Sequence, residues 1–297
     1  MNRHAASLVR LVIAMLIYGT IGVCRRALPV SSAFLSMFRG LAGSLFLVIY
    51  LIVRRQGFDC GAVKRKLLPL LVSGSLIGLN WILLFESYHY TTVAIATLCY
   101  YMSPVFVMVA SPLLLRKPLE RRKVVSLILS LMGMLLITGI PSGTSLSSGQ
   151  FLGILLGLGA AVLYAAVVLI NQHLTDVRSL DRTLVQLFSA GLVMLPYTLL
   201  TGGMEGFDLT LPDWLLLLVI ALVHTCIAYV LYFSSMDGLS AQSVVVISYL
   251  DPLTAVLLSA LVLHEPMNAW SIVGTVLILF AAIFAELGPA DMAHLRE

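Results

Sequence analysis

Four ionisable side chains lie inside long apolar runs of this sequence: Arg39, Glu86, His224 and Asp251. If these runs cross a membrane, a charge at the centre of the hydrocarbon is unfavourable by about 2.5–3.5 kcal/mol on insertion scales. Ionisable residues in such places face a water-filled cavity or a polar partner, and they mark binding sites, proton relays or ion pairs. These four residues are therefore the first candidates for function.

Arg39 and Glu86 are predicted to lie in the same half of the membrane. At a helical rise of about 1.5 Å per residue, Arg39 is roughly 12 Å below the outer end of its run, and Glu86 is near the outer end of the next one. An ion pair between the two would offset the desolvation of both charges. We expect the pair either to gate a cavity or contact a substrate, or only to lock two helices together.

Asp251 and His224 are predicted near the middle of the membrane, the depth at which many transporters bind their substrates. Asp251 precedes Pro252, which lacks a backbone N–H and favours a kink or break in a helix. We expect Asp251 either to bind a cationic group or a proton, or to take part in a hydrogen-bonded kink. His224 has no set of metal ligands around it, so we expect a packed, hydrogen-bonded side chain, and neither a metal nor another cofactor is predicted.

Aromatic residues provide a candidate wall for a binding cavity. Tyr101 and Tyr249 each stand three residues before a proline, Pro104 and Pro252. Such rings, together with Trp81, could stack on aromatic or cationic substrates, although tyrosines in mid-helix are also common in helix packing. We favour a lining role for Tyr101 and Tyr249. Further candidates for the same wall are Tyr100, Tyr229 and Tyr232.

The composition indicates what surrounds these side chains. Of the 297 residues, 60% are hydrophobic and 11% are charged, and the mean hydropathy is +1.03. Soluble domains have about a quarter of their residues charged, so this chain predicts an all-α integral membrane protein with the lipid bilayer as its solvent. Its four cysteines do not suggest a disulfide framework.

The apolar residues are grouped into ten segments. Each has about the length of 17–25 residues that a helix needs to cross the hydrocarbon core. The predicted transmembrane helices are 8–26, 31–53, 67–88, 92–115, 122–140, 151–173, 182–201, 212–235, 240–263 and 269–287. Short loops connect them, and the most polar break, 141–145, divides the chain into 1–145 and 146–297.

Lysine and arginine residues predict the orientation of the chain in a cell membrane. Cytoplasmic loops carry an excess of basic residues. With the N-terminus inside, fifteen of the 18 basic residues fall in cytoplasmic segments or beside them: Arg3, Arg10, Arg54, Arg55, Lys64, Arg65, Lys66, Arg116, Lys117, Arg121, Arg122, Lys123, Arg178, Arg182 and Arg296. Both termini are thus predicted to be cytoplasmic. Since topology explains these basic loops, no nucleic-acid partner is predicted.

An internal repeat relates the two parts of the chain. A shift of 148 residues places Tyr101 on Tyr249 and Pro104 on Pro252. Each part then holds five spans, and because five is odd, the second part enters the membrane in the opposite sense. The predicted fold is therefore ten transmembrane helices as two inverted five-helix repeats, an architecture typical of secondary transporters.

Several short stretches resemble a known family. Segments 80–88 (NWILLFESY), 91–94 (TTVA) and 100–104 (YYMSP) are similar to the third and fourth helices of EamA-type members of the drug/metabolite transporter superfamily. Segments 249–252 (YLDP) and 263–266 (LHEP) are similar to the matching part of the ninth helix. The resemblance implies two EamA repeats at 8–140 and 151–287. One departure is that Arg116-Lys117 stands where the second repeat has His264-Glu265.

The resemblance implies a secondary active transporter that moves a small organic metabolite by alternating access. An amino acid or a cationic, amphiphilic compound is the expected substrate, export is favoured over uptake, and protons or the solute gradient would drive the cycle. The alternative is an intramembrane enzyme or a lipid-modifying membrane protein. We do not expect an enzyme, because the sequence has no P-loop, GxSxG, HExxH or dinucleotide motif. A membrane scaffold would not explain buried charges in both halves.

Overall fold

The computed structural model describes most of the chain. The described residues are 3–103, 106–107, 110, 121, 124–125, 128–129, 132–133, 136, 147–171, 173–174, 176–201, 203, 208–235, 247–248, 250–265 and 267–286. In these residues the regular structure is helical throughout. The helices are α1 (Arg3–Gly19), α2 (Ile21–Arg26), α3 (Ser32–Val53), α4 (Cys60–Arg65), α5 (Leu67–Tyr90), α6 (Val93–Tyr100), α9 (Ser148–Asn171), α10 (Ser179–Leu200), α11 (Leu211–Val219), the π-helix η2 (Ile220–Ile227), α12 (Ala228–Ser235), α14 (Leu250–Leu261) and α15 (Ala269–Glu286).

Six of these helical stretches are long and apolar enough to cross a membrane. They are His4–Arg26, Ser32–Val53, Leu67–Tyr90, Ser148–Asn171, Ser179–Leu200 and Leu211–Tyr232. Two shorter apolar helices, Leu250–Leu261 and Ala269–Ala281, accompany them. The chain is thus an all-helical, multi-pass membrane protein. The count of ten helices stays a prediction, because the spans predicted at 92–115, 122–140 and 240–263 lie partly outside the described residues.

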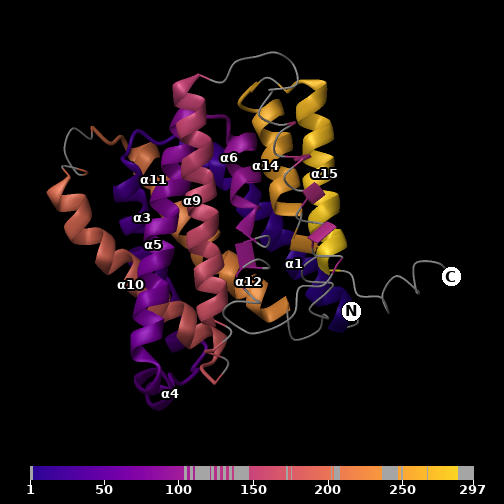
Figure 1. The fold of residues 1–297 in the computed structure, drawn as a ribbon. Coiled ribbons are helices and arrows are strands. Elements are labelled where there is room, and N and C mark those ends of the chain that lie inside the picture. Colours follow the sequence, from indigo (N-terminus) through magenta and orange to yellow (C-terminus); the bar gives the residue numbers. More distant parts are fainter. Residues whose placement is uncertain are drawn as a thin grey trace.

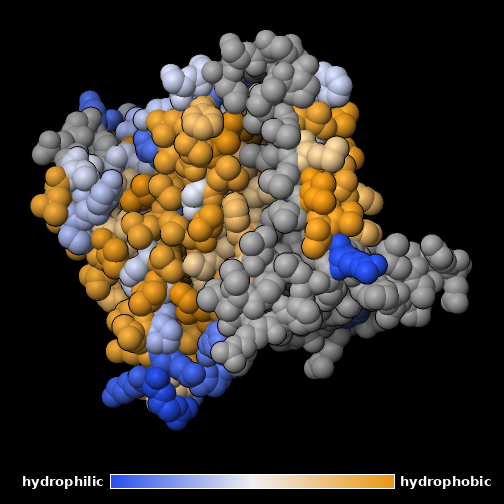
Figure 2. Space-filling view, viewed as in Figure 1, coloured by the Kyte–Doolittle hydropathy of each residue, from blue (hydrophilic) through white to orange (hydrophobic). Residues whose placement is uncertain are grey.

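Local capping explains where several helices begin. The side chain of Ser31 accepts a hydrogen bond from the backbone N–H of Phe34 at the start of α3, and Thr92 accepts one from Ile95 at the start of α6. These side chains satisfy N–H groups that the first turn of a helix leaves unpaired. The helices that follow expose aliphatic side chains outward, and Figure 2 shows an apolar belt between two more polar ends. That surface is suited to lipid.

Glycines allow the central helices to approach closely. A Cβ atom on Gly40 of α3 would lie 2.5 Å from the backbone N of Gly191 in α10. On Gly74 of α5 it would lie 2.6 Å from the carbonyl O of Gln186, also in α10. Real side chains cannot be accommodated at such distances. Small residues therefore bring α10 against both α3 and α5, as they do in other membrane bundles.

Helices from the two parts of the chain pack chiefly against each other. Helix α10 packs on α3 and α5, and α9 packs on α5 and α6. Helix α1 packs on α12 and α14, while α3 packs on η2 and α6 on α14. Figure 1 shows this interleaving, with helices of the first part and of the second alternating across the bundle. The centre of the bundle is consequently formed by both parts.

The topology can be tested with reporter fusions at positions 60, 145 and 297. Position 60 begins α4, which has basic residues in its last turn, and both α4 and the start of α1 lie toward the lower end of the view in Figure 1. We expect the three fusions to report cytoplasm, exterior and cytoplasm, because basic residues are retained inside. An external C-terminus would contradict the ten-helix prediction.

Candidate functional site

Asp251 and Tyr101 meet at the centre of the bundle, although 150 residues separate them in sequence. Asp251 lies in the first turn of α14, and Tyr101 follows the last residue of α6. The Tyr101 hydroxyl donates a hydrogen bond to Oδ2 of Asp251. A residue of the first part of the chain thus fixes the orientation of the carboxylate in the second part. The sequence-predicted partners Tyr249 and Pro104 lie outside the described residues.

Arg39 is held by aromatic rings and by one helix. Its guanidinium carbon lies 4.3 Å from the ring centroid of Trp81 and 5.9 Å from that of Phe85, both on α5. Its Nε donates to Oγ1 of Thr225 at 2.8 Å, and Nη2 lies 3.5 Å from the carbonyl O of His224. A cation over an aromatic face away from bulk water is stabilised by the ring quadrupole. The predicted site residues Arg39 and Trp81 are therefore in direct contact.

The expected Arg39–Glu86 ion pair does not form. Among the residues that the structure describes, Arg39 has no carboxylate within ion-pair distance. Glu86 instead lies within electrostatic range of Arg25 and His89. The prediction rested on the depth of the two residues in the membrane. Whether they touch also depends on the direction of each side chain around its helix axis, which changes by about 100° from one residue to the next. Trp81 and Phe85 share the face of α5 toward Arg39, and Glu86 points elsewhere.

A π-helix shapes the part of the site around Arg39. The segment Ile220–Ile227 bonds in the wider i→i+5 pattern for eight residues within the membrane span Leu211–Tyr232. π-helical turns are rare in proteins overall. Where they do occur, they are frequently found at functional sites. Here the wider turn presents both the hydroxyl of Thr225 and the carbonyl of His224 to one guanidinium. The sequence analysis missed Thr225, because the run IALVHTCI has the composition of any apolar helix.

The side chain of His224 takes part in helix packing. Its Nε2 lies 2.7 Å from Oγ1 of Thr20, the residue between α1 and α2, and the side chain is buried. Its backbone carbonyl O is the atom that lies 3.5 Å from Nη2 of Arg39. No group of three or more potential metal ligands occurs in the described part of the chain.

Tyrosine rings surround the space near Asp251 and Arg39. Tyr100 packs on Tyr101 and on Tyr164, with centroid distances of 6.0 and 5.5 Å, and Tyr18 packs on Tyr229 at 5.9 Å. Tyr18, Tyr100, Tyr101 and Tyr229 are half-buried, and Tyr164 is exposed. We call these five residues the tyrosine cluster.

Both charges lie near this tyrosine cluster. Asp251 is half-buried, and it lies within electrostatic range of Arg39. The buried Arg39 in turn lies within electrostatic range of Tyr18, Tyr100 and Tyr229. Tyr18 and Tyr164, which sequence analysis did not name as site residues, contribute to the cluster from α1 and α9. The signal that could have found them is that a shift of 146 residues superposes the two.

A second polar cluster lies at the end of the bundle opposite to α4. Nη2 of Arg26 lies 3.0 Å from Oε1 of Glu265, and the same nitrogen donates to the carbonyl O of Thr91 at 2.8 Å. Oε2 of Glu265 accepts hydrogen bonds from the backbone N–H of Val93, at 2.8 Å, and from the Ser259 hydroxyl. One carboxylate thus joins the end of α2, the start of α6 and the end of α14.

Comparison with known proteins places the chain in a family. The model of the EamA-like transporter family matches residues 6–139 and 151–286. The chain belongs to the EamA-like transporter family. The two matched stretches include Tyr101 and Asp251, which meet across the two parts of the chain. The family resemblance predicted from short segments of the sequence is confirmed.

Relatives of this EamA-like protein are named as transporters. An uncharacterized transporter of Bacillus subtilis, YxxF, is 28% identical over 277 residues, which cover 93% of this chain and 88% of the relative. An uncharacterized transporter of Archaeoglobus fulgidus is 27% identical over 279 residues, covering 93% and 94%. A solved structure titled only as a crystal structure of a protein superposes with a TM-score of 0.66 at 16% identity and covers 99% of both chains, so the fold is shared.

Thr225 should be needed for stability because it accepts a hydrogen bond from a buried guanidinium. Replacing Thr225 by Val keeps the shape and leaves Nε of Arg39 unpaired, which should lower stability by about 1–3 kcal/mol. Thermal unfolding in detergent measures the loss. Thr198→Val is the matched control, since the buried Thr198 hydroxyl only donates to the carbonyl of Met194 in its own helix. Equal losses in the two variants would contradict this role.

Arg26 and Glu265 should be energetically coupled. Their side chains are 37% and 11% exposed, so we expect a coupling of about 0.5–1 kcal/mol in a double-mutant cycle of Arg26→Gln and Glu265→Gln. Chemical or thermal unfolding in detergent gives the four stabilities. Additive losses would show that the contact contributes nothing as a pair.

Proposed function

We propose that this EamA-like protein is a secondary active transporter that exports a small organic metabolite by alternating access. An amino acid or a cationic, amphiphilic compound is the substrate class that its cavity suits best. The observation that carries the proposal is a cluster of tyrosines within membrane-spanning helices, next to one carboxylate, Asp251, and one guanidinium, Arg39. In the proposal, these side chains line the substrate cavity. Ionisable residues at such depth mark substrate or ion pathways.

The two charges and the rings suit a molecule with separated functional groups. Asp251 offers two oxygens to an ammonium group or a proton, and Arg39 offers N–H donors to an anionic or carbonyl oxygen. Tyrosine and tryptophan faces suit apolar, aromatic or cationic parts of a ligand. Among the described residues, the buried hydroxyl of Tyr18 has no hydrogen-bond partner, which leaves it free to bind one.

The pattern of helix packing supports two inverted five-helix repeats, with halves 1–145 and 146–297. In this proposal α1 corresponds to α9, α3 to α10, α5 to the continuous helix α11–η2–α12, and α6 to α14. The main helix contacts of one half then have counterparts in the other. The contact of α1 with α12 mirrors that of α9 with α5, and α3 with η2 mirrors α10 with α5. The α3–α10 and α6–α14 contacts each join two equivalent helices, so in this proposal they lie on the two-fold axis that relates the repeats. Such symmetry makes packings open to either side nearly equal in energy.

One asymmetry gives the site a titratable group. The shift of 148 residues places Asp251 on Ser103, a buried neutral residue. At this pair of equivalent positions, only the second half carries a carboxylate, which could exchange a proton or a cation. At the outer end, the Arg26–Glu265 contact joins segments of both halves and is one of the contacts that must break when the cavity opens outward. The cell membrane with both termini in the cytoplasm is the proposed location.

Replacing Asp251 by Asn tests the proposal. The variant keeps the size of the side chain and an oxygen that can accept from Tyr101, so folding should be retained. We expect transport of cationic or zwitterionic solutes to fall more than that of neutral ones, and the pH dependence of transport to disappear. Uptake into proteoliposomes at two pH values, with a panel of metabolites, measures both, and thermal unfolding in detergent checks the fold.

Asp176→Asn provides the charge-matched control. Asp176 is an exposed carboxylate between α9 and α10, and its ion-pair partner is Lys66 at 3.9 Å. This variant should transport as the unmodified protein does. A folded Asp251→Asn protein with normal transport and an unchanged pH profile would overturn the role of the carboxylate. The binding site would then have to be sought among the tyrosines and Arg39.

A further inference from the structure

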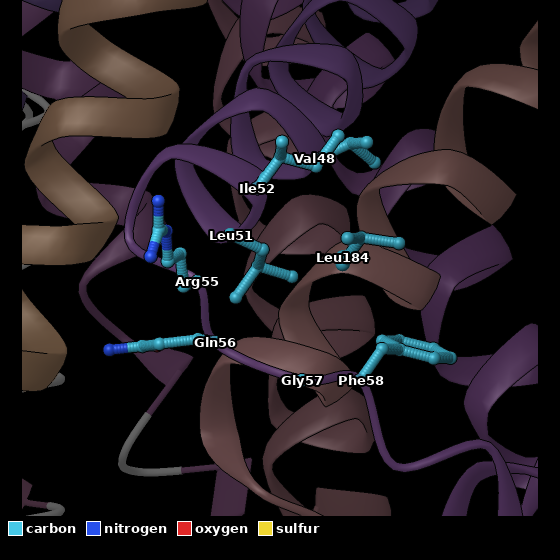
Figure 3. Close-up of a pocket in the computed structure, with 8 residues that line it drawn as sticks. All are labelled: Val48, Leu51, Ile52, Arg55, Gln56, Gly57, Phe58 and Leu184. Carbon is cyan, nitrogen blue, oxygen red and sulfur yellow. The ribbon is translucent and has the colours of Figure 1, made fainter.

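A separate hollow lies at the end of the bundle where the basic loops gather. It has a volume of about 450 Å³ and lies between the end of α3 and the start of α10 (Figure 3). Its walls are the apolar side chains of Val48, Leu51, Ile52, Phe58 and Leu184. Aliphatic walls of this kind bind hydrocarbon rather than a polar metabolite. The hollow is therefore distinct in chemistry from the cavity around Asp251.

The hollow opens toward the lipid. On α3 the exposed residues Leu45, Val48, Ile49 and Ile52 recur at the spacing of one helix face. Two of them, Val48 and Ile52, line the hollow. On α10, Leu184 lies one turn before the exposed Phe188. The surface continuous with the hollow is thus the belt that faces the acyl chains of the bilayer.

Arg55 stands at the rim in a conformation that normally favours glycine. Helix α3 ends with N–H bonds from Arg55 to the carbonyl O of Ile52 and from Gln56 to that of Leu51, the pattern of a Schellman cap. The cap places Arg55 at a φ of 50°, in the left-handed region. This position usually carries glycine, because a Cβ atom is unfavourable there by about 1–2 kcal/mol. An arginine at this position suggests a use for its side chain.

Hydrogen bonds connect the rim to α10, and the guanidinium of Arg55 stands apart from them. Arg178 donates to the carbonyl O of Gly57 and forms an ion pair with Asp181 at 2.7 Å, while the backbone N of Asp59 bonds to the same carboxylate. The loop after α3 is thereby fastened to the start of α10. Within the described part of the chain, the guanidinium of Arg55 has neither an ion-pair nor a hydrogen-bond partner. Figure 3 shows its side chain and that of Gln56 projecting from this loop.

We propose that the hollow binds an anionic phospholipid of the inner leaflet, with one acyl chain against Leu51 and Leu184 and the phosphate at Arg55. Charge complementarity selects this occupant: Arg54 and Arg55 flank the hollow, and no acidic side chain lines it. Basic pockets between helices on the cytoplasmic side are suited to the headgroups of anionic lipids. Gln56 also lines the hollow, and its amide offers further N–H donors to a lipid headgroup.

The test compares phosphatidylglycerol with phosphatidylcholine of the same acyl chains. The full-length protein in detergent is titrated with each lipid, and thermal unfolding and native mass spectrometry record stabilisation and bound lipid. We expect phosphatidylglycerol to bind more strongly. Arg55→Gln should weaken its binding about fivefold, the effect of one basic residue near an anionic lipid. Leu184→Trp, which fills the hollow, should lower binding of both lipids.

Controls separate a site from general surface charge. Arg54→Gln removes an adjacent exposed charge that does not line the hollow, and it should weaken binding less than Arg55→Gln. Arg55→Gly should remove the unfavourable left-handed conformation of a residue with a Cβ atom and so raise the melting temperature without lipid. The same variant should lose the preference for phosphatidylglycerol. Equal losses in the Arg54 and Arg55 variants, or unchanged binding in Leu184→Trp, would overturn the proposal. So would equal binding of the two lipids.

Discussion

A guanidinium inside a bilayer needs partners from the protein, and in this molecule Arg39 obtains them from two neighbouring helices. Trp81 and Phe85 provide ring faces from α5, and Thr225 and His224 provide oxygens from η2. None of these partners is a carboxylate, so the positive charge is solvated without being neutralised. Much of the central arrangement follows from this need, because α3, α5 and η2 must be close enough to reach one side chain.

The π-helix provides the oxygen atoms that contact Arg39. Its segment Ile220–Ile227 brings the hydroxyl of Thr225 and the carbonyl of His224 to this side chain of α3. π-helical segments are rare in proteins, and many of them occur at functional sites. This one continues directly into α12, which carries Tyr229 of the tyrosine cluster.

The charged residues discussed above lie at three depths of the bundle. Asp251 and Arg39 occupy the middle, Arg26 and Glu265 join helix ends on one side, and Arg55 lies at the rim of an apolar hollow on the other. Each charge has a different kind of partner: a tyrosine hydroxyl for Asp251, a carboxylate for Arg26, and in our proposal a lipid phosphate for Arg55. The membrane explains the separation, since each layer has a different solvent.

The sequence by itself determined the class of the protein, the family and most of the described helices, because apolar length and short motifs are local properties of the chain. Asp251 and Tyr101 could be singled out for the same reason: a carboxylate in an apolar run and a tyrosine before a proline are visible in one dimension. Only the tertiary structure decided which side chains meet. It turned Glu86 away from Arg39, because the direction of a side chain around its helix depends on how the helix packs. It also revealed Thr225, the π-helix and the tyrosines of α1 and α9, since contacts between residues far apart in the sequence follow from packing and leave no local pattern to find.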